Sequence, residues 1–135
     1  MSKKITEFAE SIGIIYSSKI AEKINEQKNG MIAVLMLLDE STNLSPIDVS
    51  EKLELSRART TNLLKKLFSK GYIFIYSDEL DKRKLKIEIS PKGKEYISLK
   101  KDTYVDILTK MYDELGENNV RKLIHLAKNI NEIER

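Results

Sequence analysis

Residues 44–72 read LSPIDVSEKLELSRARTTNLLKKLFSKGY, and this stretch decides the fold. Ser45 is a favourable helix N-cap, Pro46 suits the first helical position, and Asp48 stands three residues after the cap. This pattern predicts a short helix that ends near Leu53.

A second helix is expected after a turn at Glu54-Leu55. Ser56 is its predicted N-cap, and Gly71 is expected to end it just after Lys70. Two capped helices joined by so short a turn are typical of a helix–turn–helix.

The pattern of the chain changes after this pair of helices. Residues 72–76 are β-branched and aromatic, residues 77–82 are polar, and Leu85, Ile87 and Ile89 then alternate with charged residues. These features predict a β-hairpin, so the stretch reads as a helix–turn–helix followed by a wing.

Amphipathic helices are predicted on both sides of this core. Residues 4–27 read as one helix, and residues 31–40 are apolar nearly all round and should lie at the centre of the fold. Ser90-Pro91 repeats the capping signature and opens a long helix to about Leu115, and a last helix begins at Glu117 or Asn118. Residues 41–44 form a short connection that could include one stub strand.

The expected fold is mainly α with a small β-hairpin: a winged helix–turn–helix flanked by long N- and C-terminal dimerisation helices. We expect one domain over residues 1–135, with a DNA-binding core at 30–90 and its wing at about 77–84. Residues 1–28 and 91–135 would be the dimerisation helices, because a monomer of this size could not cover all their apolar stripes.

Composition excludes several classes of protein. The chain has no cysteine, which rules out disulfides and thiolate metal sites, and it has no apolar run long enough to span a membrane. The N-terminus does not resemble a secretory signal, so we expect a cytoplasmic, nucleoid-associated protein.

Positive charge is concentrated in the middle third of the chain. Residues 44–94 carry twelve Lys and Arg against seven Asp and Glu, whereas the segments before and after each have a net charge of −1. Residues 56–70 hold five basic side chains and no acid, which suits a phosphate backbone, although a solvated helix face remains an alternative.

The second helix of a helix–turn–helix enters the major groove with its N-terminal part. Arg57 and Arg59 could read guanine edges, and Asn62 could read adenine. Ser56, Thr61 and Lys65 suit phosphate contacts that set the register. The predicted DNA-binding residues are Ser56, Arg57, Ala58, Arg59, Thr61, Asn62, Lys65, Lys66, Lys82, Arg83 and Lys84.

The wing offers a second basic element. Lys82, Arg83 and Lys84 lie at its tip and on the return strand, and Arg83 is the expected minor-groove residue. Asp81 could pair with Arg83 or cap the turn. The alternative is an ordinary solvated turn.

The chain resembles the MarR family in residues 44–57, in Leu63 to Ile73, in Asp81-Lys82-Arg83 and in residues 89–93. This resemblance implies a triangular dimer with intertwined first and last helices. It also implies a recognition helix at 56–70 in each major groove and Arg83 in the minor groove. Many members are repressors that release DNA when a small phenolic or lipophilic ligand enters a crevice between the dimerisation and DNA-binding parts.

The sequence departs from the family pattern at Glu54, where a turn glycine or small residue is usual, and at Arg59 and Thr60. Site preference therefore cannot be transferred from other members. Tyr16, Tyr96 and Tyr104 are candidates to line a ligand crevice, although packing in the dimer interface is the alternative.

No enzyme is expected, since the chain lacks a Gly-rich phosphate loop and a nucleophile–base pair. His125 is the only histidine, and we expect no metal site and no cofactor. The predicted function is sequence-specific binding of double-stranded DNA by a homodimer, in a repressor that acts on a pseudo-palindromic operator, with a small-molecule effector as a further partner. The alternatives are a protein-interaction winged helix (an antirepressor or complex subunit) and a non-specific architectural DNA binder.

Overall fold

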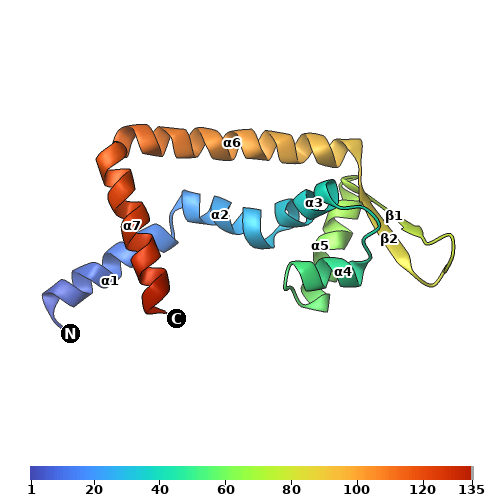
Figure 1. Cartoon of the computed structure of the whole chain (residues 1–135), viewed down its shortest axis with the longest axis horizontal. Helices are drawn as coiled ribbons and strands as arrows, with labels where there is room; N and C mark the ends of the chain where they lie inside the picture. Colours follow the sequence, from blue (N-terminus) through green and yellow to red (C-terminus); the bar gives the residue numbers. More distant parts are fainter. Residues whose placement is uncertain (135) are drawn as a thin grey trace. The chain divides into compact units, whose positions relative to one another are not determined.

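The computed structural model describes residues 1–134 and confirms the mainly α fold with one hairpin (Figure 1). It divides into two compact units, one from Met1 to Lys101 and one from Asp102 onward. The elements, in chain order, are α1 (Lys3–Tyr16), α2 (Lys19–Asn29), α3 (Met31–Glu40), α4 (Pro46–Lys52), α5 (Arg57–Ser69), β1 (Ile73–Ser77), β2 (Leu85–Ile89), α6 (Pro91–Leu115) and α7 (Glu117–Ile133).

The prediction of one helix over residues 4–27 is wrong, because the chain breaks between α1 and α2. The Ser18 side chain accepts a hydrogen bond from the Ala21 N–H (3.2 Å) and thereby caps α2. The Ser17 hydroxyl donates to the Gly13 carbonyl at 2.7 Å. Adjacent serines that bond to nearby backbone offer the chain an alternative to a continuous helix. The apolar periodicity runs across this break and hides it.

The caps predicted for the helix–turn–helix are confirmed. Ser45 and Asp48 form a reciprocal capping box at the start of α4, in which each side chain accepts from the other residue's backbone N–H, at 3.2 and 2.9 Å. The Ser56 side chain accepts from the Arg59 N–H and begins α5. Gly71 has a φ of 77° directly after α5, a left-handed conformation that favours glycine.

The hydrophobic core of the first unit lies where α3, α4, α5 and the hairpin meet (Figure 1). As expected, α3 is buried on most of its surface and forms the centre of this core. The buried core residues are Val34, Leu35, Leu38, Leu44, Val49, Leu63, Leu64, Leu67, Ile73 and Ile87.

The hairpin pairs β1 with β2 in antiparallel register, with Ile73 opposite Ile89 and Ile75 opposite Ile87. Leu44 adds an isolated bridge to Ile87, whose N–H donates to the Leu44 carbonyl at 2.9 Å. The expected stub strand in the connection before α4 is this bridge, and it ties the base of the wing to the helix–turn–helix.

The start of α6 is fixed to the turn between α5 and β1. The Ser90 side chain caps α6 by accepting from the Gly93 N–H (3.0 Å), and its hydroxyl donates to the Gly71 carbonyl at 2.6 Å. Gly93 is buried, and a Cβ at this position would overlap the backbone carbonyl of Tyr72. Only glycine allows this approach.

The second unit contains the distal part of α6 and all of α7. None of the described residues of α7 is buried, although Leu123, Ile124, Leu126 and Ile130 are large and apolar. Within residues 1–134, no helix is both long and apolar enough to span a membrane.

Candidate nucleic-acid interface

One face of α5 is buried and the opposite face is open. Thr60 lies in the core with Leu63, Leu64 and Leu67. The face that points away from the core is exposed and carries no acidic residue. Its members are Ala58, Thr61, Asn62, Lys65 and Lys66.

The two arginines of α5 lie on opposite flanks of this open face. Arg57 lines a small pocket with Pro46, Ile47 and Ser50 of α4. Arg59 lines a different pocket beside α2, with Glu22 and Glu26. Asn62 lies on the face between them. The three predicted base-reading residues therefore span the width of α5, because residues two positions apart point to different sides of a helix.

The neighbours of Arg59 could not be read from the sequence. The charge count of residues 56–70 treats α5 as an isolated basic element, whereas the fold brings the acidic side of α2 beside its first turn. The sequence analysis predicted neither the separate helix α2 nor its position beside α5.

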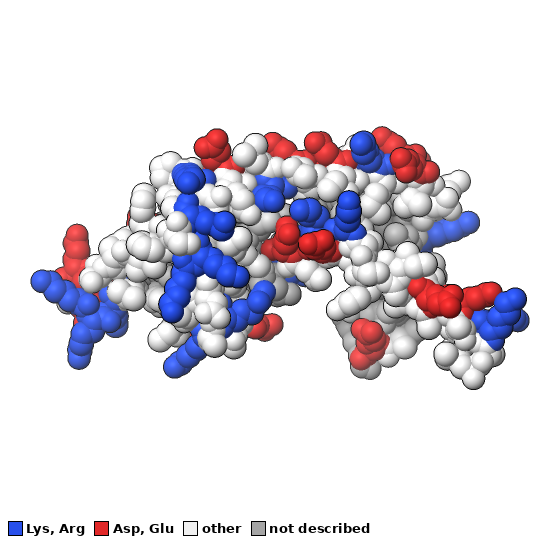
Figure 2. Space-filling view, turned by 180° about the vertical axis from the view of Figure 1, so that it is seen from behind, with Lys and Arg blue, Asp and Glu red and all other residues white. Residues whose placement is uncertain are grey.

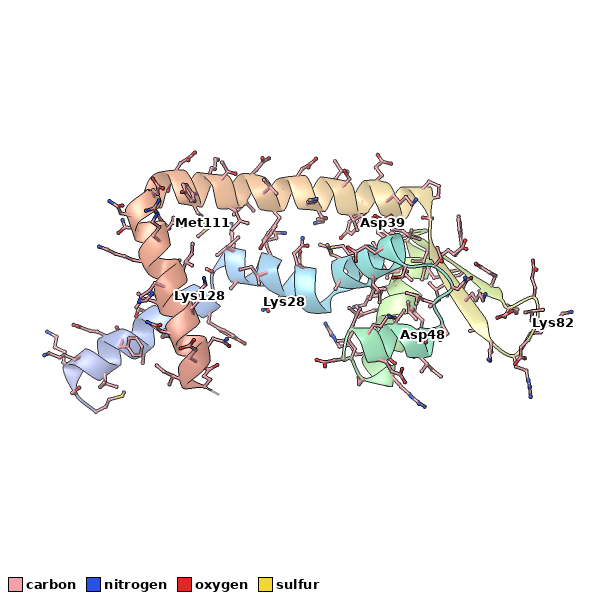
Figure 3. All side chains as sticks on the ribbon, viewed as in Figure 1. Lys28, Asp39, Asp48, Lys82, Met111 and Lys128 are labelled. Carbon is pink, nitrogen blue, oxygen red and sulfur yellow. The ribbon has the colours of Figure 1, made fainter. Side chains whose placement is uncertain are left out.

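The wing holds its arginine in a defined position. The Asp81 carboxylate accepts hydrogen bonds from the Arg83 backbone N–H (3.1 Å) and from Arg83 Nε (3.2 Å). Asp81 therefore both caps the turn and pairs with Arg83, the two roles that the sequence left open. The Arg83 side chain stays 92% exposed, and Figure 3 labels its neighbour Lys82 at the tip of the wing.

Asp78, the first acidic residue of the wing, has different partners from Asp81. Asp78 accepts a hydrogen bond from the Leu80 backbone N–H (2.9 Å) and pairs with Lys86, at 3.6 Å. The Leu80 N–H is the main cause that holds the pKa of Asp78 below its ordinary value, and the charge of Lys86 acts in the same direction.

The wing and α5 both carry exposed basic side chains. In Figure 2, Lys and Arg side chains cover the wing tip at the left and the neighbouring region that contains α5. A groove of about 610 Å³ separates the wing from α4, and its lining includes Asn43, Pro46, Asp78, Arg83 and Lys84. None of its lining residues comes from α5, and the lining includes the acids Asp48 and Asp78.

The three tyrosines suggested for a ligand crevice differ in their surroundings. Tyr96 stacks on Tyr72 with ring centroids 4.5 Å apart, and its burial is the main cause that raises its pKa. Tyr16 is exposed on α1, and Tyr104 belongs to the second unit.

A cavity of about 290 Å³ lies between the first unit's α3 and the start of α6, and none of these three tyrosines lines it. Its lining residues are Gln27, Met36, Asp39, Glu40, Lys94, Ile97, Ser98 and Lys101. A ligand crevice formed by the tyrosines stays a prediction.

Comparison with known proteins gives consistent results. The sequence model of the MarR family matches residues 29–85, which include α3 to β1 and end at the first residue of β2. The chain is 26% identical over 105 residues to the HTH-type transcriptional regulator BilQ of Clostridioides difficile, covering 76% of this chain and 71% of BilQ. It is 29% identical over 93 residues to the HTH-type transcriptional regulator SarZ of Staphylococcus epidermidis, covering 69% of this chain and only 54% of SarZ.

Solved structures share the fold over nearly the whole chain. The YusO protein from Bacillus subtilis has a TM-score of 0.73 at 16% identity, covering 98% of this chain and 99% of YusO. Streptococcus pneumoniae FabT, solved in complex with DNA, has a TM-score of 0.65 at 20% identity, covering 97% of this chain and 95% of FabT. At these identities the likeness shows a common architecture.

Proposed function

We propose that the chain is a MarR-family DNA-binding transcriptional regulator, a repressor that binds a pseudo-palindromic operator as a homodimer. It would act on chromosomal DNA in the cytoplasm. One observation carries the proposal: the acid-free face of α5 and the Asp81-held Arg83 are both exposed and belong to the same compact unit.

In this mechanism α5 enters the major groove of each half-site. Asn62, at the centre of the open face, would read adenine through its amide, and the flanking Arg57 and Arg59 would read guanine edges. Ser56, Thr61, Lys65 and Lys66 would contact phosphates and fix the register. Ala58 is small enough to let the helix backbone approach the bases.

The wing would follow the DNA backbone into the adjacent minor groove. Arg83 is the inserted residue, because its side chain is 92% exposed and its guanidinium is already oriented by Asp81. Lys82 and Lys84 would contact the flanking phosphates.

A second copy of the chain would complete the molecule. Exposed apolar side chains recur on α1 (Ile5, Phe8, Ile12 and Ile15) and on α7 (Leu123, Ile124 and Ile130). Monomeric soluble proteins rarely leave such stripes uncovered. A two-fold dimer would set its two recognition helices one turn of the DNA apart, which makes the operator pseudo-palindromic.

A binding titration tests this function. Purified protein is titrated into labelled random duplex at two salt concentrations, and operator duplex selected from a random library is then competed with unlabelled random DNA. The proposal expects a steep loss of affinity with salt and retention of the selected duplex under competition. Absence of any duplex binding would favour a protein-interaction module, and complete displacement by random DNA would favour an architectural binder.

A further inference from the structure

We propose that Lys86 is a positioning residue of the wing and not a phosphate contact, and that Lys86, Asp78 and Asn43 together hold the wing in the orientation used for DNA. We call these three residues the wing bracket. The inference rests on the proposed DNA-binding function and assigns Lys86 a role different from that of the other basic residues near the wing.

The bracket joins three segments that are distant in the sequence. Lys86 Nζ, on β2, donates a hydrogen bond to Asn43 Oδ1 at 3.0 Å and lies 3.6 Å from Asp78 Oδ2. Asn43 belongs to the connection before α4, and Asp78 begins the wing turn. Two backbone partners, Leu44 and Ile87, bond to each other directly beside the bracket. The side chains thus extend the bridge outward from the core towards the wing.

Exposure separates Lys86 from the residues that face solvent. Its side chain is 26% exposed and that of Asp78 is 19% exposed, against 92% for Arg83. A lysine whose charge is already compensated by a shielded carboxylate gains little from a phosphate, because it would first have to leave its partner. Lys86 therefore adds little to the cationic surface.

The bracket continues into the turn that carries Arg83. The Asp78 N–H donates to the Lys84 carbonyl (2.9 Å), and the Lys84 N–H donates to the Asp81 carbonyl (3.0 Å). Asp81 in turn holds Arg83. A path of contacts runs from the helix–turn–helix through Asn43, Lys86 and Asp78 to the minor-groove arginine. Asn43 has a φ of 61°, a left-handed conformation that asparagine tolerates better than most residues.

The direction in which one substitution changes DNA affinity tests the proposal. Asp78→Asn raises the net charge of the wing by one, and simple electrostatics or a phosphate-contacting Lys86 would then strengthen DNA binding. A positioning role expects the opposite, a loss of about fivefold in affinity for the selected operator, because the wing is no longer held. Stronger binding by Asp78→Asn would overturn the proposal.

Glu79→Gln is the matched control. It makes the same charge change one residue further along the turn, and Glu79 takes no part in the bracket. We expect this variant to bind the operator as tightly as the unaltered protein or slightly more tightly. A loss equal to that of Asp78→Asn would mean that any charge change in this turn impairs binding, and it would count against the bracket.

The double variant Lys86→Met with Asp78→Asn keeps the net charge of the unaltered protein. If the two side chains act as a unit, the double variant loses about as much affinity as either single variant and keeps the original salt slope. If Lys86 binds phosphate, the slope falls by about 0.9 for each lysine removed, and the proposal fails.

Hydrogen exchange on the free protein separates failure of the bracket from failure of the DNA-binding function. Lys86→Met should speed the exchange of the Asp78 and Lys84 amides by about tenfold or more, while the Val34 amide in the core keeps its rate. Unchanged wing exchange refutes the bracket whatever the protein does with DNA. Faster wing exchange in a protein that binds no duplex supports the bracket and rejects the proposed function.

Discussion

At the scale of single residues, the basic side chains near the wing differ in their surroundings although they look alike in the sequence. Arg83 is oriented by Asp81 and remains almost fully exposed, whereas Lys86 is paired and mostly covered. Charge counting gives both the same weight. We propose a contact role for Arg83 and a positioning role for Lys86, because burial and pairing decide how much charge reaches a ligand.

Replacing Arg83 with alanine should weaken binding to all duplexes by about tenfold and flatten the salt slope by about one unit per protomer. The reason is the loss of one cation from the minor groove without any change at the major-groove bases. Fluorescence anisotropy at several salt concentrations measures both quantities. Arg121→Ala, which removes the same side chain from α7, serves as the control and should leave the slope unchanged.

The backbone conformation of Glu54 explains why a small residue is favoured at this position in the helix–turn–helix corner. Its φ is 54°, in the left-handed region where a side chain costs free energy. The departure noted in the sequence is therefore a strained residue, and the corner keeps its conformation despite it.

Glu54→Gly should raise the free energy of unfolding by about 0.5–1 kcal/mol, because glycine relieves the left-handed strain and this gain exceeds its entropy cost. Glu54→Val should lower the same quantity. Urea unfolding followed by circular dichroism measures both variants. A glycine variant less stable than the unaltered protein would show that this φ carries no strain.

At the scale of elements, local signals predicted most of the structure. The two serine caps, Pro46 and Gly71 each determine a helix end through contacts within a few residues, so the sequence alone could place the helix–turn–helix. The break at Ser17-Ser18 was missed because the apolar spacing continues across it. The inward turn of Lys86 could not be predicted either, since its partner Asn43 lies 43 residues away.

The close packing of α6 against the α5–β1 turn predicts that a larger residue at Gly93 lowers stability. Gly93→Ala should lower the free energy of unfolding by at least about 2 kcal/mol, because the added Cβ overlaps a backbone carbonyl that cannot move alone. Gly13→Ala is the matched control. A Cβ at Gly13 meets nothing within 4 Å, so that variant should gain about 0.5–1 kcal/mol from helix propensity. Equal effects of the two changes would argue against the close packing.

The capping box of α4 makes stability depend on acid pH. The backbone N–H of Ser45, and next its hydroxyl, hold the pKa of Asp48 below the ordinary 3.8. A lowered pKa stabilises the fold fully above the ordinary value and loses that stabilisation as pH falls through the folded value. Stability should therefore hold down to about pH 4 and decline below it, and Asp48→Asn should make the decline shallower. Urea unfolding at several acid pH values decides this, and an identical decline in both proteins would contradict it.

At the scale of the whole molecule, the winged helix and α7 differ in how far their apolar side chains are buried. The hydrophobic core cluster draws its residues from Val34 to Ile87, so the winged helix has its own core. In α7, by contrast, the described residues are all unburied within one chain. Burial of apolar surface against a second copy would supply the stabilisation that α7 lacks alone.

Ile130→Glu should convert the proposed dimer to a monomer and reduce operator affinity by at least about a hundredfold, since each half-site alone binds weakly. Sedimentation velocity measures the oligomeric state, and circular dichroism should show that the winged helix stays folded. Asn129→Glu places the same charge on the polar side of α7 and should leave the dimer intact. A monomeric unaltered protein would remove the basis of this prediction.

Selection of bound sequences from a random duplex library by the purified protein tests the central claim most directly. We predict that the enriched sequences contain an inverted repeat whose half-sites lie about one helical turn apart, matched to two α5 helices in consecutive major grooves. Enrichment of single, unrepeated sites, or no enrichment at all, would contradict a dimer that reads DNA with α5 and its wing.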